Sequence, residues 1–128
     1  MTALETLSIS KTDAIPDFGL STRALQLLRN LFAAEPTVQR VIVYGSRAMG
    51  NFRHGSDIDL ALDAPSMDYG VFMRMHTRID DLMLPWEVDL SLISDIDNPE
   101  LLAHIARVGK PLWVRNAAQT KETEKGCL

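Results

Sequence analysis

The sequence predicts an α/β (α+β) domain, in which helices cover one face of a small mixed β-sheet. Apolar residues recur at helical spacing in three segments, and apolar and polar residues alternate in two shorter ones. A run of β-branched residues, "RVIVY", adds a buried strand that ends at a glycine. The two kinds of segment alternate along the chain, which is typical of helices layered on a sheet.

Length and composition are those of an ordinary globular domain. The 128 residues are enough for one modest core, and 46% of them are hydrophobic. A net charge of −4 argues against general nucleic-acid binding, which rests on basic surfaces. The single cysteine, Cys127, excludes a disulfide within the chain, and no apolar run reaches membrane-spanning length. The first 18 residues lack the apolar core of a signal peptide, so we expect a cytoplasmic protein without membrane contact.

The first half of the chain predicts a helix, a strand and a short helix. Ser21 or Thr22 can cap the first helix, and Glu35-Pro36 ends it because proline disfavours helical geometry in the preceding residue. The strand at 40–44 runs into "SRAMGN", which is long enough for one or two helical turns.

The second half predicts alternating strands and helices. Ser66 can cap the middle helix, and Asn98 or Asp97 the last one, which has proline at its first position. These elements are strands at 57–62, 86–93 and 110–114, and helices at 66–84 and 99–108. The expected organisation is an N-terminal arm (1–19), one domain (20–114) and a polar tail (115–128).

The tetrapeptide "SDID" occurs twice, at 56–59 and 94–97. The second copy precedes a helix start, where aspartates accept backbone hydrogen bonds, and that structural role explains it. The first copy opens a strand, so Asp57 and Asp59 project from the same face. A divalent cation would offset the repulsion between them; a solvent-facing strand that carries two acids by chance is the alternative.

Further residues suggest a nucleotide site beside this pair. Gly45 and Ser46 end a strand and begin a short helix, an arrangement that favours phosphate, and Arg47 adds a charged donor unless it is a surface arginine. Asp89 lies on the polar face of a later strand and joins the pair if the strands are neighbours in register. Three carboxylates beside a phosphate site are suited to two magnesium ions holding a nucleoside triphosphate.

The stretch "GSRAMGNFRHGSDIDLAL", followed by "WEVDLSLI", resembles the nucleotidyltransferase superfamily that includes DNA polymerase beta. Over residues 20–113 the chain is most similar to minimal nucleotidyltransferases, single domains encoded beside a helical HEPN partner. The resemblance implies a polymerase-beta-like fold, in which Asp57, Asp59 and Asp89 bind two Mg²⁺ ions and catalyse the transfer. It also implies that Gly45, Ser46 and Arg47 hold ATP.

The activity that the resemblance implies is transfer of AMP to a hydroxyl of a HEPN toxin, with the chain acting as antitoxin. Two alternatives remain at this stage: a binding module that neutralises the HEPN partner by contact alone, and nucleotidyl transfer to a small molecule such as an aminoglycoside. Nucleotide choice and the homo- or hetero-oligomeric state stay open. His76 and His104 lack metal-ligand spacing and are interpreted as surface or partly buried histidines, and Tyr44 as a core residue or one that packs under a base.

Overall fold

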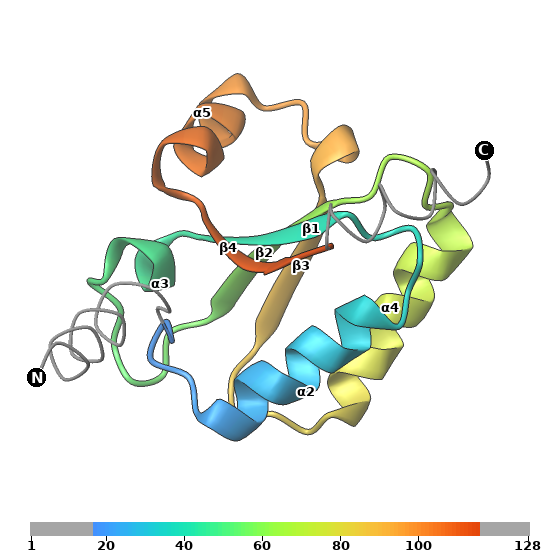
Figure 1. Ribbon diagram of the computed structural model, residues 1–128. Helices are drawn as coiled ribbons and strands as arrows, with labels where there is room; N and C mark the ends of the chain where they lie inside the picture. Colours follow the sequence, from blue (N-terminus) through green and yellow to red (C-terminus); the bar gives the residue numbers. More distant parts are fainter. Residues whose placement is uncertain (1–16, 116–128) are drawn as a thin grey trace, which may run out of the picture.

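The computed structural model describes residues 17–115 (Figure 1). Most of the predicted arm, most of the predicted tail and Cys127 lie outside these residues. The strands are β1 (Arg40–Tyr44), β2 (Ile58–Asp63), β3 (Val88–Leu92) and β4 (Lys110–Val114). The helices are α2 (Thr22–Ala33), α3 (Ser46–Met49), α4 (Tyr69–Asp81) and α5 (Pro99–Val108), with a 3₁₀ turn, η1 (Ile93–Asp95), after β3.

The four strands form one mixed sheet in the order β3-β2-β1-β4. The central strand β1 runs antiparallel to both of its neighbours, β2 and β4. Strands β2 and β3 are parallel, and α4 supplies the crossover that parallel neighbours require. The predicted small mixed sheet is therefore confirmed, and every predicted strand segment lies in it.

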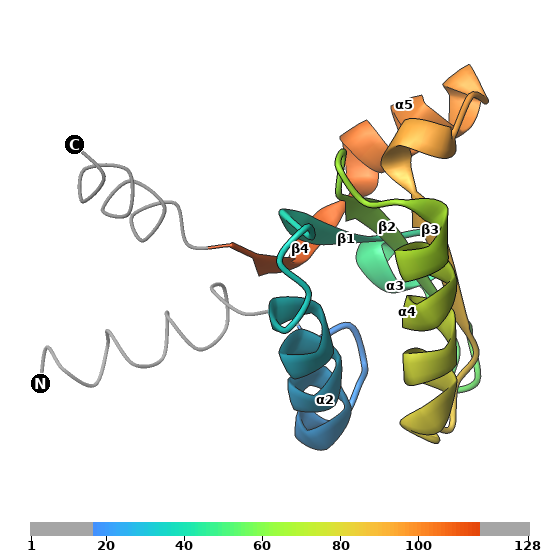
Figure 2. The same cartoon turned by 90° about the vertical axis from the view of Figure 1, so that its right-hand side faces the viewer.

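The main core lies between the sheet and the helix pair α2 and α4, which Figures 1 and 2 show on the same side of the sheet. Alternate residues of β2, Ile58, Leu60 and Leu62, face this core and are fully buried. Phe32 of α2 packs on them without solvent exposure. Burying each such side chain stabilises the fold by about 1.5–3 kcal/mol.

Helix α5 packs on the opposite face of the sheet (Figure 1). Its residue Ile105 forms a small second core with Tyr44 and Ala61, which point away from the main core. The expectation of helices on one face thus holds for α2 and α4, and α5 departs from it. The physical reason is that this face carries apolar residues, among them Ile42, that need a cover of their own.

Helix ends follow the capping rules, with one correction. Ser21 caps α2 by accepting from the N–H of Ala24, and Asn98 caps α5. Helix α4 begins at Tyr69 and its cap is Asp68, so the prediction of a helix from 66 to 84 with Ser66 as cap was wrong. Residues 64–67 instead form a turn, closed by a hydrogen bond from the N–H of residue 67 to the carbonyl of residue 64.

The packed domain extends slightly beyond the predicted bounds of 20 and 114. Phe18 is only 5% exposed and belongs to the main core. Arg115 donates to the backbone carbonyls of Val38 and Glu35 at 2.9 Å each, which holds the end of β4 against the segment before β1. None of the helices within 17–115 has the length and apolar character needed to cross a membrane.

Candidate active site

Three aspartates lie at one end of the sheet. Asp59 of β2 is the register partner of Asp89 on the parallel strand β3, so both side chains project from the face opposite the main core. Asp57 lies two residues before Asp59, directly ahead of β2. On the other side, Asp59 is the register partner of Tyr44, the last residue of β1 before the Gly45–Ser46 turn. The sheet register therefore brings the predicted acids and the predicted phosphate turn together.

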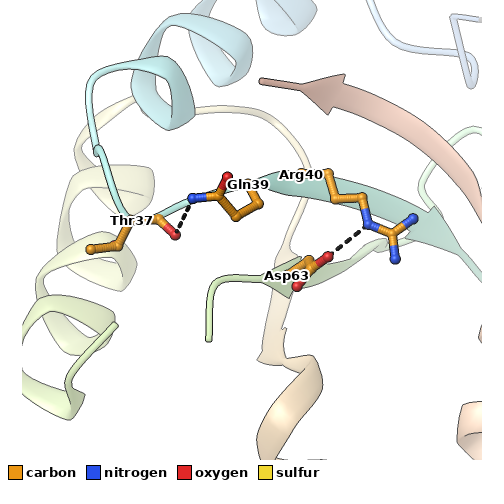
Figure 3. A network of polar contacts seen from close by, with 4 residues as sticks. All are labelled: Thr37, Gln39, Arg40 and Asp63. Carbon is orange, nitrogen blue, oxygen red and sulfur yellow. Dashed lines mark hydrogen bonds and ion pairs between the residues drawn. The ribbon is translucent and has the colours of Figure 1, made fainter. Parts of the chain in front are cut away.

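The negative charges of these aspartates have no cationic partner among residues 17–115 within 4 Å. Asp63, on the same face at the far end of β2, shows the contrast: its Oδ2 accepts from Nε of Arg40 at 2.7 Å (Figure 3). Burial raises the pKa of Asp59, and the neighbouring charges of Asp89 and Asp57 raise it further, against a smaller opposing effect of His104. Within residues 17–115, no ion pair relieves the repulsion in this cluster.

The donor set suits a hard divalent cation, since carboxylate oxygens are the ligands that Mg²⁺ prefers. In the present side-chain conformations, no three carboxylate, imidazole or thiol groups within 17–115 converge closely enough to hold one ion. Register partners on neighbouring strands are about 4.8 Å apart at the backbone. The side chains of Asp57 and Asp89 are both exposed, so packing does not fix their rotamers.

The glycine of the Gly45–Ser46 turn is required by the structure in two ways. Its backbone angles, φ 74° and ψ −154°, are accessible essentially to glycine alone. A Cβ at this position would overlap Oδ2 of Asp59 and would lie 3.3 Å from its Cγ. The backbone of the turn thus lies so close to the Asp59 side chain that no Cβ fits between them. Helix α3 starts immediately after the turn, with Ser46 as its first residue. The N–H groups of Ala48 and Met49 donate to the carbonyl of Gly45, so only those of Ser46 and Arg47 lack a helical acceptor.

The side chain of Arg47 does not reach the outer surface of the Gly45–Ser46 turn. Its side chain is 2% exposed and donates to the carbonyls of Phe18 at 2.8 Å and Ser56 at 2.9 Å. The guanidinium also lies over the rings of Phe52 and Trp86, at 4.8 and 5.5 Å from their centroids. Burial lowers the pKa of Arg47, while the charge of Asp57 acts in the opposite direction. This placement contradicts both the predicted phosphate contact and the alternative of a surface arginine.

His104 of α5 is a site residue that the sequence reasoning missed. Its Nε2 accepts the backbone N–H of Gly45 at 3.2 Å, which links α5 to the glycine turn. The ring also meets the ring of Tyr44 edge-on, 6.2 Å between centroids. Burial raises the pKa of Tyr44, with Asp89 and Asp59 adding to the effect and a hydrogen bond with Ser91 opposing it. A sequence signal existed: His104 interrupts the apolar stripe of α5.

The comparison with family models decides to which family this chain belongs. The model of the family described as polymerase beta, nucleotidyltransferase matches residues 26–118, most of the chain. The chain belongs to this family. No curated protein matches this nucleotidyltransferase domain in sequence.

Solved structures share the nucleotidyltransferase fold of the domain. A toxin–antitoxin structure with AMP-PNP is 21% identical, covers 80% of this chain and 88% of that chain, and has a TM-score of 0.59. A tyrosine-to-alanine variant of an MntA toxin–antitoxin complex is 25% identical over 77% of this chain and 76% of that one, with a TM-score of 0.55. The MntA–HepT toxin–antitoxin structure is 20% identical over 80% and 79%, with a TM-score of 0.54.

Proposed function

We propose that this chain is a magnesium-dependent nucleotidyltransferase that transfers AMP from ATP to a hydroxyl group of a HEPN toxin. In this proposal it acts in the cytoplasm as the antitoxin of that partner. The observation that carries the proposal is the register of β1, β2 and β3. This register makes Asp59 and Asp89 neighbours on β2 and β3, where neither has an ion-pair partner among residues 17–115, and sets the Gly45 turn directly against Asp59.

In the proposed reaction Asp57, Asp59 and Asp89 would hold two Mg²⁺ ions. When bound, Mg²⁺ supplies positive charge that stabilises the entering and leaving oxygens. The Ser46 hydroxyl and the backbone N–H groups of Ser46 and Arg47 bind phosphate oxygens, and Gly45 allows the chain to come close to them. The acceptor oxygen forms a bond to the α-phosphorus as the bond to pyrophosphate breaks, and Asp89 helps to take the hydroxyl proton.

The acceptor belongs to another protein chain in this proposal. Asp57 and Asp89 are exposed, and a minimal domain leaves its cleft open, so a partner protein can bring a hydroxyl group to the carboxylates. Similar structures support a toxin partner, since they are toxin–antitoxin complexes, and one of them contains AMP-PNP, an ATP analogue. A small-molecule acceptor would need walls around the carboxylates, and Asp57 and Asp89 are exposed.

The test is a labelling experiment with the HEPN protein encoded beside this chain. The two proteins are mixed with Mg²⁺ and ATP labelled at the α-phosphate, and both chains are examined for label. Label is expected on the HEPN protein with wild type and absent with Asp57→Asn or Asp59→Asn. Asp63→Asn is the matched control, because it removes a carboxylate from the same face of β2 at the end remote from the site.

A second readout separates catalysis from binding. Neutralisation of the HEPN toxin that persists in Asp57→Asn and Asp59→Asn, without label on either chain, would contradict the proposal and favour neutralisation by contact. Loss of both label and neutralisation in these variants, with both retained in Asp63→Asn, is the result that the proposed transfer requires.

A further inference from the structure

The segment that delivers Asp57 to the site has no regular secondary structure. Residues 51–57 connect α3 to β2, and one tight turn gives them local order. In that turn the N–H of Arg53 donates to Oγ of Ser56 at 2.8 Å, and the N–H of Ser56 donates back to the carbonyl of Arg53 at 3.0 Å. These bonds define the turn itself, but they do not fix its position relative to the sheet.

Arg47 fixes that position. Nε and Nη2 of Arg47 donate to the carbonyl of Ser56, the residue directly before Asp57, at 3.1 and 2.9 Å. Nη2 also donates to the carbonyl of His54 at 3.3 Å, and Nε1 of Trp86 donates to the same carbonyl at 3.2 Å. The backbone on the N-terminal side of Asp57 is therefore held by a rigid, planar, charged fork.

The same guanidinium joins segments that are far apart in the chain. Its Nη1 donates to the carbonyl of Phe18, before α2, and its Cζ lies over the rings of Phe52 and of Trp86, before β3. Gly19 completes the arrangement: a Cβ there would overlap the Phe52 ring and lie 3.0 Å from Nη1 of Arg47. Neutral carbonyls thus solvate the guanidinium, and no carboxylate within residues 17–115 forms an ion pair with it.

We infer that Arg47 is a positioning residue for the metal site: it fixes residues 52–56 so that Asp57 is presented to a divalent cation. This inference rests on the proposed function only in taking Asp57 as a metal ligand. It replaces the phosphate contact expected for Arg47 with a structural link between the N-terminal segment and the site. Lysine cannot substitute, because an ammonium group lacks the planar fork that donates to several carbonyls at once.

The test measures Mn²⁺ binding to the full chain, by calorimetry and by the electron paramagnetic resonance signal of free Mn²⁺. Arg47→Met is expected to weaken binding by about 10–100-fold, as loss of a supporting partner of a metal ligand typically does. Arg47→Lys, which keeps the charge, is expected to recover only part of this loss. Arg53→Met is the matched control, since Arg53 is an exposed arginine on the same segment, and wild-type affinity is expected.

Two further variants separate positioning from general destabilisation. Leu28→Ala, in the main core, lowers stability without touching the segment, so its folded form should bind Mn²⁺ as wild type does. Gly19→Ala disturbs Phe52 and Arg47 from the opposite side and should weaken Mn²⁺ binding even if Arg47→Met fails to fold. In wild type, Mn²⁺ should change the fluorescence of Trp86, and this change should be lost in Gly19→Ala.

The outcomes distinguish this inference from the proposed function. Wild-type affinity in folded Arg47→Met, or in Gly19→Ala, overturns the positioning role and leaves the transfer reaction unaffected. Weakened binding in these variants, with wild-type affinity in Arg53→Met and Leu28→Ala, supports the positioning role even if no label reaches a partner. A wild-type chain that does not bind Mn²⁺ overturns both.

Discussion

Replacing Gly45 by alanine tests the contact on which the proposed site depends. The added Cβ would overlap Oδ2 of Asp59 and would lie 3.3 Å from its Cγ and 3.6 Å from its Cβ. Because Oδ2 is the end of the side chain, the carboxylate can rotate away from the methyl group. The fold should then survive, but Asp59 would no longer point where the register of β2 and β3 places it beside Asp89.

Gly45→Ala should have two separate effects: the backbone conformation of residue 45 sets the loss of stability, and the contact with Asp59 sets the loss of cation binding. A non-glycine residue at φ 74° and ψ −154° costs on the order of 1–3 kcal/mol. For a domain of this size, about 1 kcal/mol corresponds to a Tm change of roughly 4–8 °C, so Gly45→Ala should lower Tm by roughly 5–20 °C. Displacement of the Asp59 carboxylate should weaken divalent-cation binding by more than about tenfold. Tenfold is the lower end of the loss in metal affinity that typically follows removal of a supporting contact.

Gly50→Ala is the matched control. Gly50 also has a positive φ, 87°, but a Cβ there would meet no atom within 4 Å. Gly50→Ala should therefore lose most of the stability that Gly45→Ala loses, but it should not displace the Asp59 side chain. Thermal unfolding of both variants with and without Mg²⁺ separates the two: a ligand at 100 times its Kd stabilises a protein by about 2.7 kcal/mol.

The expected result is a clear rise of Tm with Mg²⁺ in wild type and Gly50→Ala, and little or none in Gly45→Ala. If Gly45→Ala gains as much stability from Mg²⁺ as Gly50→Ala does, the close approach of the turn to Asp59 has no role in cation binding. The geometric argument for the site would then be refuted.

The remaining predictions concern stability and its dependence on pH. Asp59→Asn should raise the Tm of the metal-free protein, because like charges in cross-strand pairs cost about 0.2–1 kcal/mol, and it should abolish the response to Mg²⁺. The pKa of Asp59 is raised in the folded state, so the folded protein binds this proton more readily than the unfolded protein does. The stability of the metal-free protein should therefore fall as the pH rises from the ordinary carboxyl pKa through the raised pKa of Asp59. Unfolding titrations of wild type and Asp59→Asn across this range should differ in slope, and equal slopes would contradict the assignment. Phe32→Ala should cost about 3–5 kcal/mol in denaturant unfolding, because Phe32 is fully buried in the main core. Arg40→Ala should change stability by less than about 1 kcal/mol, since its ion pair with Asp63 is partly exposed, and a larger loss would show that the pair is stronger than its exposure indicates.

The three aspartates of the candidate site illustrate how much can be predicted from local sequence pattern. Alternation along 57–62 was enough to place Asp57 and Asp59 on one face, because side chains of a strand alternate regardless of what surrounds it. The cap of α5 was equally readable, since Asn98 satisfies N–H groups two and three residues away. The position of Asp89 required one further condition, that β2 and β3 be neighbours in register, and the sheet meets it.

The direction of the Arg47 side chain could not be predicted in this way. The acceptors of its guanidinium belong to Phe18, His54 and Ser56. The rings under it are Phe52, on the same segment as His54 and Ser56, and Trp86, before β3, so the packed position exists only after these segments have assembled. The bond between His104 and Gly45 is likewise made across 59 residues of sequence.

By itself, then, the sequence determined which residues share a face, where most helices begin and end, and which acids open a strand. These properties depend on backbone geometry over a few residues. Tertiary structure alone decided that α5 covers the site's face of the sheet, that a histidine holds the glycine turn, and that Arg47 supports the segment before Asp57. Those features depend on contacts between distant segments, whose geometry is set by the packing of the whole domain.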